Sequence, residues 1–554
     1  MAWRYLSVVA AVVRAVSALW PLPTQLSTGT TALILASDFD IDISTITNPP
    51  EDLLNAISRT KGYIQTDQLE ALVVDRGASY AQSLQNASSL SSLVLSFDSG
   101  FNGEPTSISE EAADDIENRV EGYSLTVPED GSAATIKANS TLGLFRGLTT
   151  FGQLWYDLSN TTYTVEAPIT ITDSPVYPYR GFMLDTARNY FPVSDILRTL
   201  DAMSWVKMTT FHWHMVDSQS FPLEVPEFPE LSAKGAYGSS LVYSTDDVQN
   251  IISYAAARGI DVLPEIDTPG HTAVIAQAYP EHVACPGATP WATYANEPPA
   301  GQLRFANADT TNFTTSLISS ISSQFPGKYF STGGDELNTE CYAIDDSTQA
   351  DLNATGKTLE QALDTFTQSV HSVLENSGKT PVVWEEMVLD FNLTLSNNTI
   401  VMVWISSADA AAVADKGFRL VQAPSDYFYL DCGAGGWVGA NPSGNSWCDP
   451  FKTWQYAYSF DPIANMTDAQ AKLVIGGEHL LWTEQSHASN LDPIVWPRAA
   501  ASAELFWSGP GGDISEALPR LHDIAFRMTQ RGVGAIALQP LWCALRPGVC
   551  DLTA

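Results

Sequence analysis

The stretch Arg180-Gly-Phe-Met-Leu-Asp-Thr-Ala-Arg188 indicates the fold of most of this chain. Its apolar part has the length of one buried strand, and charged residues follow directly where that strand would end. A helix-length segment, Ser194–Val206, comes next, and another apolar stretch begins at Thr209. A strand, a helix and a further strand in this order are typical of a parallel sheet covered by helices.

The same alternation continues along the rest of the chain. Strands are expected at residues 181–185, 209–214, 260–265, 329–334, 381–385, 400–404, 418–422 and 473–478. Helices between them are expected at Ser194–Val206, Thr245–Arg258, Asn312–Gln324 and Leu359–Ser377. Eight such strands, separated by helix-length segments, predict the α/β class and a (β/α)8 TIM barrel with insertions.

Residues 19–175 have a different pattern. The run Thr31-Ala-Leu-Ile-Leu predicts a strand, and alternating segments on both sides of Pro128-Glu-Asp-Gly predict a hairpin. A helix is expected over Leu142–Leu158, which completes an α+β pattern. The Pro-rich join Ser174-Pro-Val-Tyr-Pro-Tyr marks a boundary. We therefore expect a smaller α+β domain at 19–175, and the barrel with a C-terminal extension at 176–554.

The composition excludes several classes of protein. The chain has 554 residues, with 63 acidic against 27 basic side chains and a formal net charge of −36. Phosphate backbones and anionic membrane surfaces are repelled by such a surface, so nucleic-acid and membrane partners are not expected. Hydrophobic residues make up 45% of the chain and charged residues 16%, which excludes a disordered protein.

Three features predict a secreted, extracellular protein. Residues 1–18 contain Arg4, an apolar run and the small-residue ending Val16-Ser-Ala18, which is the pattern of a signal peptide. Candidate glycosylation sites are Asn86, Asn139, Asn160, Asn312, Asn353, Asn392, Asn397 and Asn465. The six cysteines, an even number that suits disulfide bonding, are Cys285, Cys341, Cys432, Cys448, Cys543 and Cys550. Fifteen pairings exist, and we favour pairing between neighbours in the chain.

Polar and aromatic side chains gather at the carboxyl ends of the predicted barrel strands, where the active sites of this fold form. They are Asp185, Arg188, His212, His214, Asp217, Glu265, Asp267, His271, Asp335, Glu336, Trp384, Glu385, Trp404, Tyr429, Asp431, Trp482 and Glu484. Carboxylates accept hydrogen bonds from hydroxyl groups, and indole rings stack on the apolar face of a pyranose. The set therefore indicates a sugar ligand.

The segment Gly333-Gly-Asp-Glu336 gives the sharpest chemical signal. Glycine allows a close approach of the backbone to a ligand. Two adjacent carboxylates at a strand end where water is scarce disfavour each other's ionisation, so one of them is expected to have a raised pKa. A general acid beside an ionised neighbour needs this arrangement. Taken alone, the Asp-Glu dipeptide could also be a solvated loop pair.

Six motifs together resemble those of family 20 β-N-acetylhexosaminidases, and the layout and sequons are most similar to secreted fungal members. The motifs are Arg180-Gly-Phe-Met-Leu-Asp-Thr-Ala-Arg188, His212-Trp-His-Met-Val-Asp217, Pro264-Glu-Ile-Asp-Thr-Pro-Gly-His271, Gly333-Gly-Asp-Glu336, Trp384-Glu-Glu386 and Gly476-Gly-Glu-His-Leu-Leu-Trp-Thr-Glu484. The resemblance covers nearly the whole chain. It implies a zincin-like α+β domain followed by the catalytic barrel.

The resemblance implies an exo-acting, retaining enzyme that hydrolyses terminal non-reducing β-linked GlcNAc or GalNAc. In this family the 2-acetamido oxygen of the sugar attacks the anomeric carbon and forms an oxazolinium ion. Glu336 would be the general acid and then the base. Asp335 would orient the acetamido group, and Tyr429 would hydrogen-bond its carbonyl oxygen. No cofactor or metal is implied.

Further residues are implied as binding and supporting groups. The residues implied to bind the sugar hydroxyls are Arg188, Asp431 and Glu484. The residues implied to form the pocket wall are Trp384, Trp404 and Trp482. Behind the site, Asp217 and His271 are implied to orient Asp335 and Glu336. Thr483 and Gln485 flank Glu484 at positions where the family motif varies. The sequence leaves open which of Trp437, Trp447 and Trp454 reaches the pocket.

Two other functions remain open at this stage. His212 and His214 are alternate residues of one strand, so both could face one ion in a metal-dependent hydrolase. Such a site needs further ligands on later strands, where this chain has tryptophans. The other is a non-catalytic glycan-binding barrel. Also open are GlcNAc against GalNAc preference, chito-oligosaccharides against N-glycans as substrates, and whether a homodimer forms.

Overall fold

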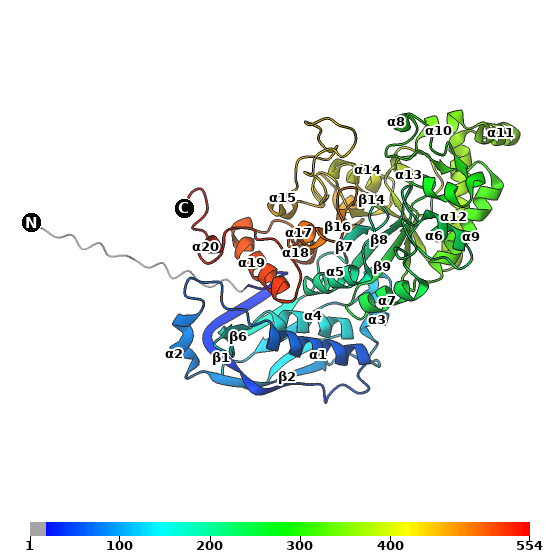
Figure 1. Ribbon diagram of the computed structural model, residues 1–554. Helices are drawn as coiled ribbons and strands as arrows, with labels where there is room; N and C mark the ends of the chain where they lie inside the picture. Colours follow the sequence, from blue (N-terminus) through cyan, green and yellow to red (C-terminus); the bar gives the residue numbers. More distant parts are fainter. Residues whose placement is uncertain (1–17) are drawn as a thin grey trace, which may run out of the picture.

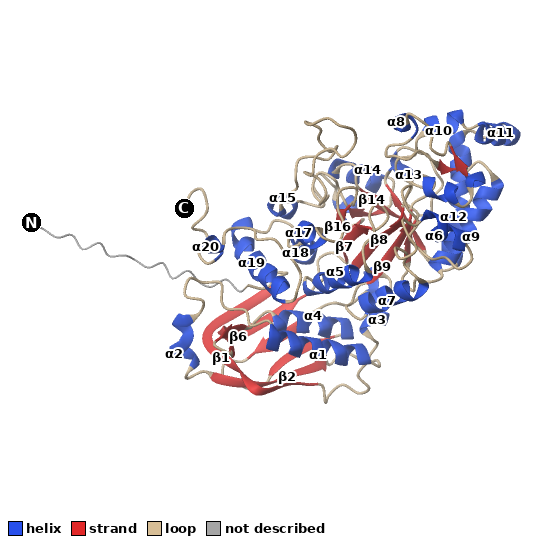
Figure 2. Ribbon diagram, in the orientation of Figure 1, coloured by secondary structure: helices blue, strands red, loops and turns tan. Residues whose placement is uncertain are grey.

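The computed structural model describes residues 18–554 (Figures 1 and 2). The expected signal peptide, residues 1–18, lies outside the described residues except for its last residue. A six-stranded sheet with its helices lies beside a closed eight-stranded barrel, and helix α19 (Ile514–Gln530) runs close to both units. Among the described helices, none combines the length and the apolar composition that a bilayer crossing requires.

The N-terminal unit is an α+β sheet with the strand order β1-β2-β4-β3-β6-β5. Its strands are β1 (Gln25–Asp42), β2 (Ser88–Phe97), β3 (Tyr123–Val127), β4 (Ala134–Ala138), β5 (Tyr156–Leu158) and β6 (Thr161–Asp173). The predicted hairpin is present, since β3 and β4 pair antiparallel with Leu125 opposite Ile136. Helices α1 (Glu51–Thr66) and α4 (Thr141–Gly152) lie against one face of the sheet (Figure 2).

The helix predicted over Leu142–Leu158 is too long, because α4 ends at Gly152. Residues Tyr156–Leu158 form β5 instead and pair antiparallel with β6. The Tyr156 hydroxyl also donates to Asp523 of α19 at 2.8 Å. The pairing with β6 is a tight hairpin within the next few residues, and Asp523 lies far away in the sequence, so strand pairing and a tertiary contact together override the helical pattern here.

All eight predicted barrel strands are confirmed. They are β7 (Tyr179–Asp185), β8 (Thr210–Val216), β9 (Asp261–Ile266), β12 (Tyr329–Ser331), β13 (Thr380–Trp384), β14 (Ile400–Val403), β15 (Arg419–Gln422) and β16 (Val474–Leu481). Neighbours pair parallel around the ring, and the last strand pairs with the first through Gly476 and Tyr179. Closure of the barrel brings the carboxyl ends of all eight strands to one rim.

The four helices predicted between these strands are also present. They are α5 (Val193–Trp205), α7 (Thr245–Ala256), α9 (Ala308–Ser322) and α12 (Leu359–Asn376). Helix α9 begins earlier than the predicted Asn312, because the Asn307 side chain accepts hydrogen bonds from the N–H groups of Asp309 and Thr310 at 2.9 and 3.2 Å.

Shorter elements connect these units. They are α2 (Ala81–Leu84), α3 (Ile108–Ala113), α6 (Pro229–Gly235), α8 (Trp291–Tyr294), α10 (Thr339–Ile344), α11 (Asp346–Thr355), α13 (Glu386–Leu389), α14 (Ala410–Asp415), α15 (Trp454–Tyr458), α16 (Asp468–Ala471), α17 (Leu491–Val495), α18 (Arg498–Ser508), α20 (Leu541–Ala544), β10 (Val283–Ala284) and β11 (Gln302–Leu303).

Disulfides join Cys285–Cys341, Cys432–Cys448 and Cys543–Cys550, which confirms the pairing of chain neighbours. The asparagine of every predicted sequon is exposed.

Buried ion pairs join the N-terminal unit to the barrel. Glu121 accepts hydrogen bonds from Arg146 of α4 at 2.8 Å and from Arg180 of β7 at 2.6 Å. Lys207, just before β8, donates to Asp173 of β6 at 2.9 Å. All five side chains are buried. Separating the units would leave uncompensated charges, so these pairs fix the two units relative to each other.

The barrel interior holds ionisable side chains as well as apolar ones. His212 lies between Glu478 at 2.9 Å and Glu265 at 3.1 Å. His214 lies between Glu265 at 2.5 Å and Asp217 at 2.8 Å. Both nitrogens of each ring therefore face carboxylates, and none of these five side chains is exposed. This arrangement argues against the metal-binding role considered for His212 and His214.

The charge of the two interior histidines predicts a pH-dependent stability. Burial favours their neutral forms, but the carboxylates outweigh it and raise the pKa of His212 to about 10 and that of His214 to about 9. In the unfolded chain both histidines would have a pKa of about 6.5. Their contribution to stability is therefore complete below about pH 6.5 and is lost as the pH rises through about 9 to 10.

We accordingly expect the free energy of unfolding, measured by urea denaturation, to decrease steadily from about pH 7 to about pH 10. A free energy of unfolding that stays constant over this range would contradict the cationic state of His212 and His214.

Candidate active site

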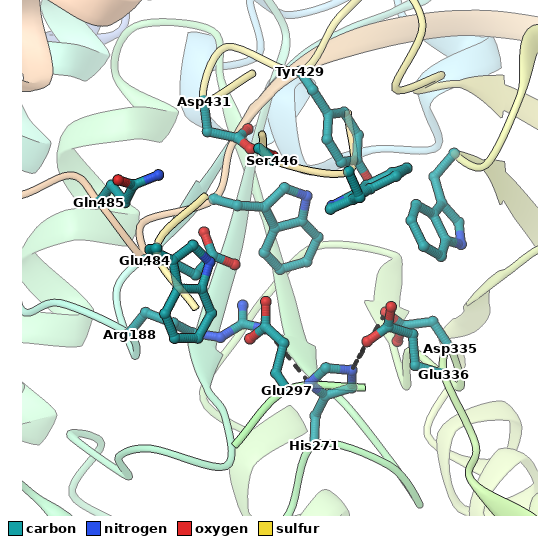
Figure 3. Close-up of a pocket in the computed structure, with 14 residues that line it drawn as sticks. Arg188, His271, Glu297, Asp335, Glu336, Tyr429, Asp431, Ser446, Glu484 and Gln485 are labelled. Carbon is teal, nitrogen blue, oxygen red and sulfur yellow. Dashed lines mark hydrogen bonds and ion pairs between the residues drawn. The ribbon is translucent and has the colours of Figure 1, made fainter. Parts of the chain in front are cut away.

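A pocket of about 610 Å³ opens at the carboxyl ends of the barrel strands (Figure 3). Its lining residues are Arg188, His271, Glu297, Asp335, Glu336, Trp404, Tyr429, Asp431, Trp437, Ser446, Trp447, Trp482, Glu484 and Gln485. In Figure 3, Arg188 and Glu484 lie on one side of the pocket and Asp335 and Glu336 lie on the other, with His271 between them. A pocket that combines aromatic walls with several converging polar groups suits a small-molecule ligand.

The loop after β12 positions the two adjacent carboxylates. Gly333 and Gly334 have φ angles of +63° and +104°, and a Cβ atom on Gly333 would lie 2.0 Å from Asp267 Oδ1. Only glycine fits both the angle and the space. Glu336 also has a positive φ, +53°, which is uncommon for a non-glycine residue and is characteristic of functional sites. Its N–H faces Glu386 Oε1 at 3.4 Å.

Asp335 lies deep in the pocket and is only 6% exposed. Burial, followed by the charge of Asp267 at the end of β9, raises the pKa of Asp335 well above the usual carboxyl range. Burial also raises the pKa of Asp267 to about 6. Asp335 Oδ1 has no hydrogen-bond partner among the described residues. A buried acceptor without a partner is costly, so this oxygen is available to a polar ligand.

The pKa of Glu336 is lowered, whereas the adjacent carboxylates in the sequence led us to expect a raised pKa for one of the two. Burial would raise the pKa of Glu336, but the hydrogen bond and charge of His271 outweigh burial and lower it. His271 Nε2 lies 3.3 Å from Glu336 Oε2, and His271 Nδ1 lies 3.1 Å from Asp217 Oδ1. The expected raised pKa therefore belongs to Asp335, and its main carboxylate neighbour is Asp267. The Glu336 side chain keeps 24% of its surface exposed, so it reaches the pocket.

Arg188 forms the polar end of the pocket. Its guanidinium lies 3.2 Å from Asp185 and 3.1 Å from Glu297. Asp185 also accepts a hydrogen bond from the backbone N–H of Thr483 at 3.1 Å. This bond ties the end of β16 to the end of β7, so Glu484, the residue after Thr483, lies on the same side of the pocket as Arg188 (Figure 3).

Tyr429 and Asp431 reach the pocket from the segment that follows β15. This segment runs beside β16, because Leu430 donates its N–H to the carbonyl of Leu480 at 2.9 Å. Residues two apart on an extended segment point to the same side. Burial raises the pKa of Asp431 to about 7. A protonated carboxyl both donates and accepts hydrogen bonds, which suits sugar hydroxyls.

Aromatic rings form the wall beside Asp335. The rings of Trp404 and Tyr429 are stacked with centroids 6.3 Å apart, and Trp482 lies 6.3 Å from Tyr429. The Trp404 indole donates to Glu386 at 2.8 Å, which fixes its orientation. The Tyr429 hydroxyl is buried and makes no hydrogen bond of ordinary geometry with the described residues.

Trp384, which the resemblance placed on the wall, does not line the pocket surface. Its side chain is 1% exposed and packs between His212, at a ring distance of 5.8 Å, and Trp482, at 6.1 Å. Trp384 therefore supports the wall from beneath.

The insertion after Asp431 forms the rim of the pocket. The Cys432–Cys448 disulfide closes it, and Trp437 and Trp447 line the rim with 39% and 65% of their surface exposed. Trp454 is buried in the core instead. No sequence pattern distinguishes these three tryptophans, because Trp437 and Trp447 lie in a loop without periodicity and Trp454 begins the short helix α15.

Sequence reasoning missed three lining residues, Glu297, Ser446 and Gln485. Glu297 and Ser446 lie in loops far from the predicted strand ends, so no pattern marked them. Gln485 follows Glu484 directly, and its position beside a barrel strand was a usable signal.

In the part of the chain that the structure describes, two groups of side chains have the spacing of metal ligands. In the first, ligand atoms of Asp267, His271 and Asp335 lie within 4.8 Å of one another. Both ring nitrogens of His271 already face carboxylates, however. The second contains Cys432 and Cys448, which form a disulfide. Neither group offers the free donor set of a usual metal site.

Comparison with known proteins identifies the family. Residues 177–510 match the family "Glycosyl hydrolase family 20, catalytic domain", and residues 19–154 match "beta-acetyl hexosaminidase like". A beta-hexosaminidase of Arthroderma benhamiae is 36% identical over 78% of this chain and 75% of its own length. A chitooligosaccharidolytic beta-N-acetylglucosaminidase of Bombyx mori is 35% identical over 79% of this chain and 75% of its own.

A solved structure agrees with the sequence comparisons. The chitobiase of Flavobacterium johnsoniae superposes with a TM-score of 0.74 at 27% identity, over 94% of this chain and 73% of that one. The match to the catalytic-domain family spans the whole barrel, including every carboxylate that lines the pocket. This chain belongs to glycosyl hydrolase family 20 and is a glycoside hydrolase of the β-hexosaminidase type.

Proposed function

We propose that this enzyme removes terminal non-reducing β-linked GlcNAc or GalNAc residues by a retaining, substrate-assisted mechanism. One observation carries the proposal. Among the described residues, one oxygen of Asp335 has no hydrogen-bond partner and the buried Tyr429 hydroxyl makes no hydrogen bond of ordinary geometry, and both side chains line one aromatic-walled pocket. An acetamido group has the complementary N–H donor and carbonyl acceptor. A ligand with this group would satisfy both buried atoms at once.

In the first step the substrate supplies the nucleophile. The acetamido oxygen attacks the anomeric carbon as the glycosidic bond breaks, and the product is a cyclic oxazolinium ion. Tyr429 donates a hydrogen bond to the acetamido oxygen and fixes its direction. Asp335 accepts a hydrogen bond from the acetamido N–H and meets the positive charge that develops there. Burial beside Asp267 destabilises the Asp335 anion in the empty pocket, so it gains most when a cation forms next to it.

Glu336 handles the proton in both steps. In its protonated form it donates to the glycosidic oxygen as that oxygen departs, and the resulting carboxylate is stabilised by His271. In the second step Glu336 accepts a proton from water as the water attacks the anomeric carbon and the oxazolinium ring opens. Two inversions at one carbon give overall retention.

The polar end of the pocket supports exo action. Arg188, Glu484 and Asp431, which line the pocket, would bind the sugar hydroxyls remote from the reacting carbon and would leave no room there for a longer chain. Trp404 and Trp482 would pack on the sugar ring and acetamido methyl, with Trp384 behind them. The name of the Bombyx mori relative favours chito-oligosaccharides as substrates, and N-glycan ends present the same terminal sugar.

The same proposal includes the setting of the enzyme. We propose an α+β domain at 19–175, a catalytic barrel at 176–554 and secretion of the chain. The three disulfides and the exposed sequons support an oxidising, extracellular environment.

Replacing the proposed acid tests the proton transfer. The Glu336→Gln variant should lose about 10²- to 10⁴-fold in kcat on chitobiose, because its leaving group needs a proton. The loss on an aryl glycoside with an acidic phenol should be far smaller. Steady-state kinetics on the two substrates measure the difference. Equal losses on both would show that Glu336 is not the acid.

Weakening the acetamido oxygen tests the source of the nucleophile. Mono-, di- and trifluoroacetamido aryl glycosides should react progressively more slowly, since each fluorine withdraws electrons from the carbonyl. The Asp335→Asn variant should lose about 10²- to 10³-fold in kcat on the unfluorinated substrate, as it cannot meet the developing cation. A rate independent of fluorination would exclude the substrate as nucleophile, whatever the effect of Asp335→Asn.

Removing metal tests the alternative hydrolase. Dialysis against EDTA should leave kcat unchanged, because the ring nitrogens of His212, His214 and His271 all face carboxylates. A loss of activity that a divalent cation restores would favour metal-dependent hydrolysis.

A further inference from the structure

An unbroken series of acid and base side chains crosses the barrel interior and ends at Glu336. We call it the buried string. In order, its members are Tyr179, Glu478, His212, Glu265, His214, Asp217, His271 and Glu336. The successive distances are 2.6, 2.9, 3.1, 2.5, 2.8, 3.1 and 3.3 Å. Tyr179 begins β7 at the amino end of the barrel, so the string runs from that end to the pocket.

The inner part of the string is isolated from water. The side chains of Glu478, His212, Glu265, His214 and Asp217 have no exposed surface. Only His271 and Glu336 reach the pocket. Charges that water does not screen act strongly on their neighbours, so the protonation of each group depends on the next one along the string.

The geometry favours alternating charges. Each of the three imidazole rings has a carboxylate at both nitrogens, and a carboxylate can only accept unless it carries a proton itself. Every contact is satisfied when His212, His214 and His271 are cationic and the intervening carboxylates are anionic. The other groups that face the carboxylates are donors or cations. Ser331 donates to Glu265 at 2.5 Å and Tyr179 to Glu478 at 2.6 Å. The Ser218 N–H donates to Asp217 at 2.5 Å, and Arg188 forms an ion pair with Asp217 at 3.1 Å.

The barrel fold by itself does not need ionisable side chains in its interior. Barrels of this type are usually filled by layers of branched apolar side chains. Buried ion pairs add little net stability compared with apolar residues of similar size, because both partners lose their hydration. A continuous buried string that ends on a pocket carboxylate therefore points to a role in the reaction.

We propose that Glu265, His214, His212 and Glu478 are positioning residues for the reaction. They act through Asp217 to keep His271 cationic and in one orientation, so that Glu336 always presents Oε2 to His271 and its other oxygen to the substrate. His271 itself has φ +52°, a conformation that needs such support. This inference rests on the proposed function, in which Glu336 is the general acid.

The Glu265→Gln variant tests the proposal, since it keeps the shape of the side chain and removes its charge. The side chain at position 265 then no longer stabilises the cationic form of His214. Burial opposes the ionisation of Asp217, and cationic neighbours including His214 keep its pKa low. In the variant that pKa rises, so the acid limb of the kcat–pH profile should move to higher pH by about half a unit or more.

The kinetic constants should separate positioning from stability. With chitobiose, Glu265→Gln should lower kcat at least ~10-fold and change KM less than ~2-fold, while kcat for an activated aryl glycoside changes less than ~3-fold. Glu504→Gln is the matched control. Glu504 is a buried carboxylate in α18 that pairs with Arg520 at 2.6 Å, apart from the string. The Glu504→Gln variant should have a lower unfolding temperature, but both of its kcat values and its pH profile should be unchanged.

Each result decides the proposal. If the pH profile of Glu265→Gln equals that of Glu504→Gln, or if both substrates lose kcat equally, the string is only structural. If Glu265→Gln does not fold, Glu478→Gln, one ring further from the pocket, is judged by the same criteria, with a smaller shift in the same direction expected.

The Glu336→Gln variant separates this inference from the proposed function. If Glu336→Gln shows no leaving-group dependence, the acid role itself fails. If Glu336→Gln behaves as an acid variant and the string variants behave like Glu504→Gln, only the present inference is overturned.

Discussion

The carboxylate of Asp217 forms an ion pair with Arg188 at 3.1 Å and hydrogen bonds with His214 at 2.8 Å and with His271 at 3.1 Å, and it has no exposed surface. Arg188 faces the polar end of the pocket, His271 faces Glu336, and His214 faces the barrel interior. The backbone N–H of Ser218 also donates to it, and a buried anion held by this many groups is costly to move. This single group therefore sets the distance between the polar end of the pocket and the proposed acid. Arg188, Asp217 and His271 follow three successive strands, so closure of the barrel brings them together.

Two carboxylates that are neighbours in sequence have opposite electrostatic settings. Asp335 lies against Asp267 and its pKa is raised, first by burial; Glu336 lies against His271 and its pKa is lowered. Under the proposed mechanism both settings are useful. An anion that is destabilised in the empty pocket favours a cation formed beside it, and a carboxylate left after proton donation is stabilised by an imidazolium. The glycine pair before Asp335 makes this possible, because the backbone turns sharply and sends the two side chains to different neighbours.

The N-terminal unit contacts the barrel at the end opposite the pocket. Arg180, Lys207 and Gly259 lie at the amino ends of β7, β8 and β9, and each contacts the N-terminal unit, through Glu121, Asp173 and Arg146 respectively. Within the described residues, none of those that line the pocket comes from this unit. Its contacts brace the strand ends from which the buried string begins at Tyr179.

The sequence by itself determined the eight barrel strands, the hairpin and the family, because alternating strand and helix lengths and motifs at strand ends are local properties of the chain. It also placed nine of the pocket-lining residues among its candidates, since residues that end parallel strands must share one rim. Only the tertiary structure decided that Asp267 is the partner of Asp335, that Trp384 lies beneath the wall, and that Glu297 and Trp447 complete the rim. It also decided that His212 and His214 belong to a buried string. The physical reason is that pKa values, burial and loop positions depend on groups far apart in sequence, whose separations only the folded chain defines.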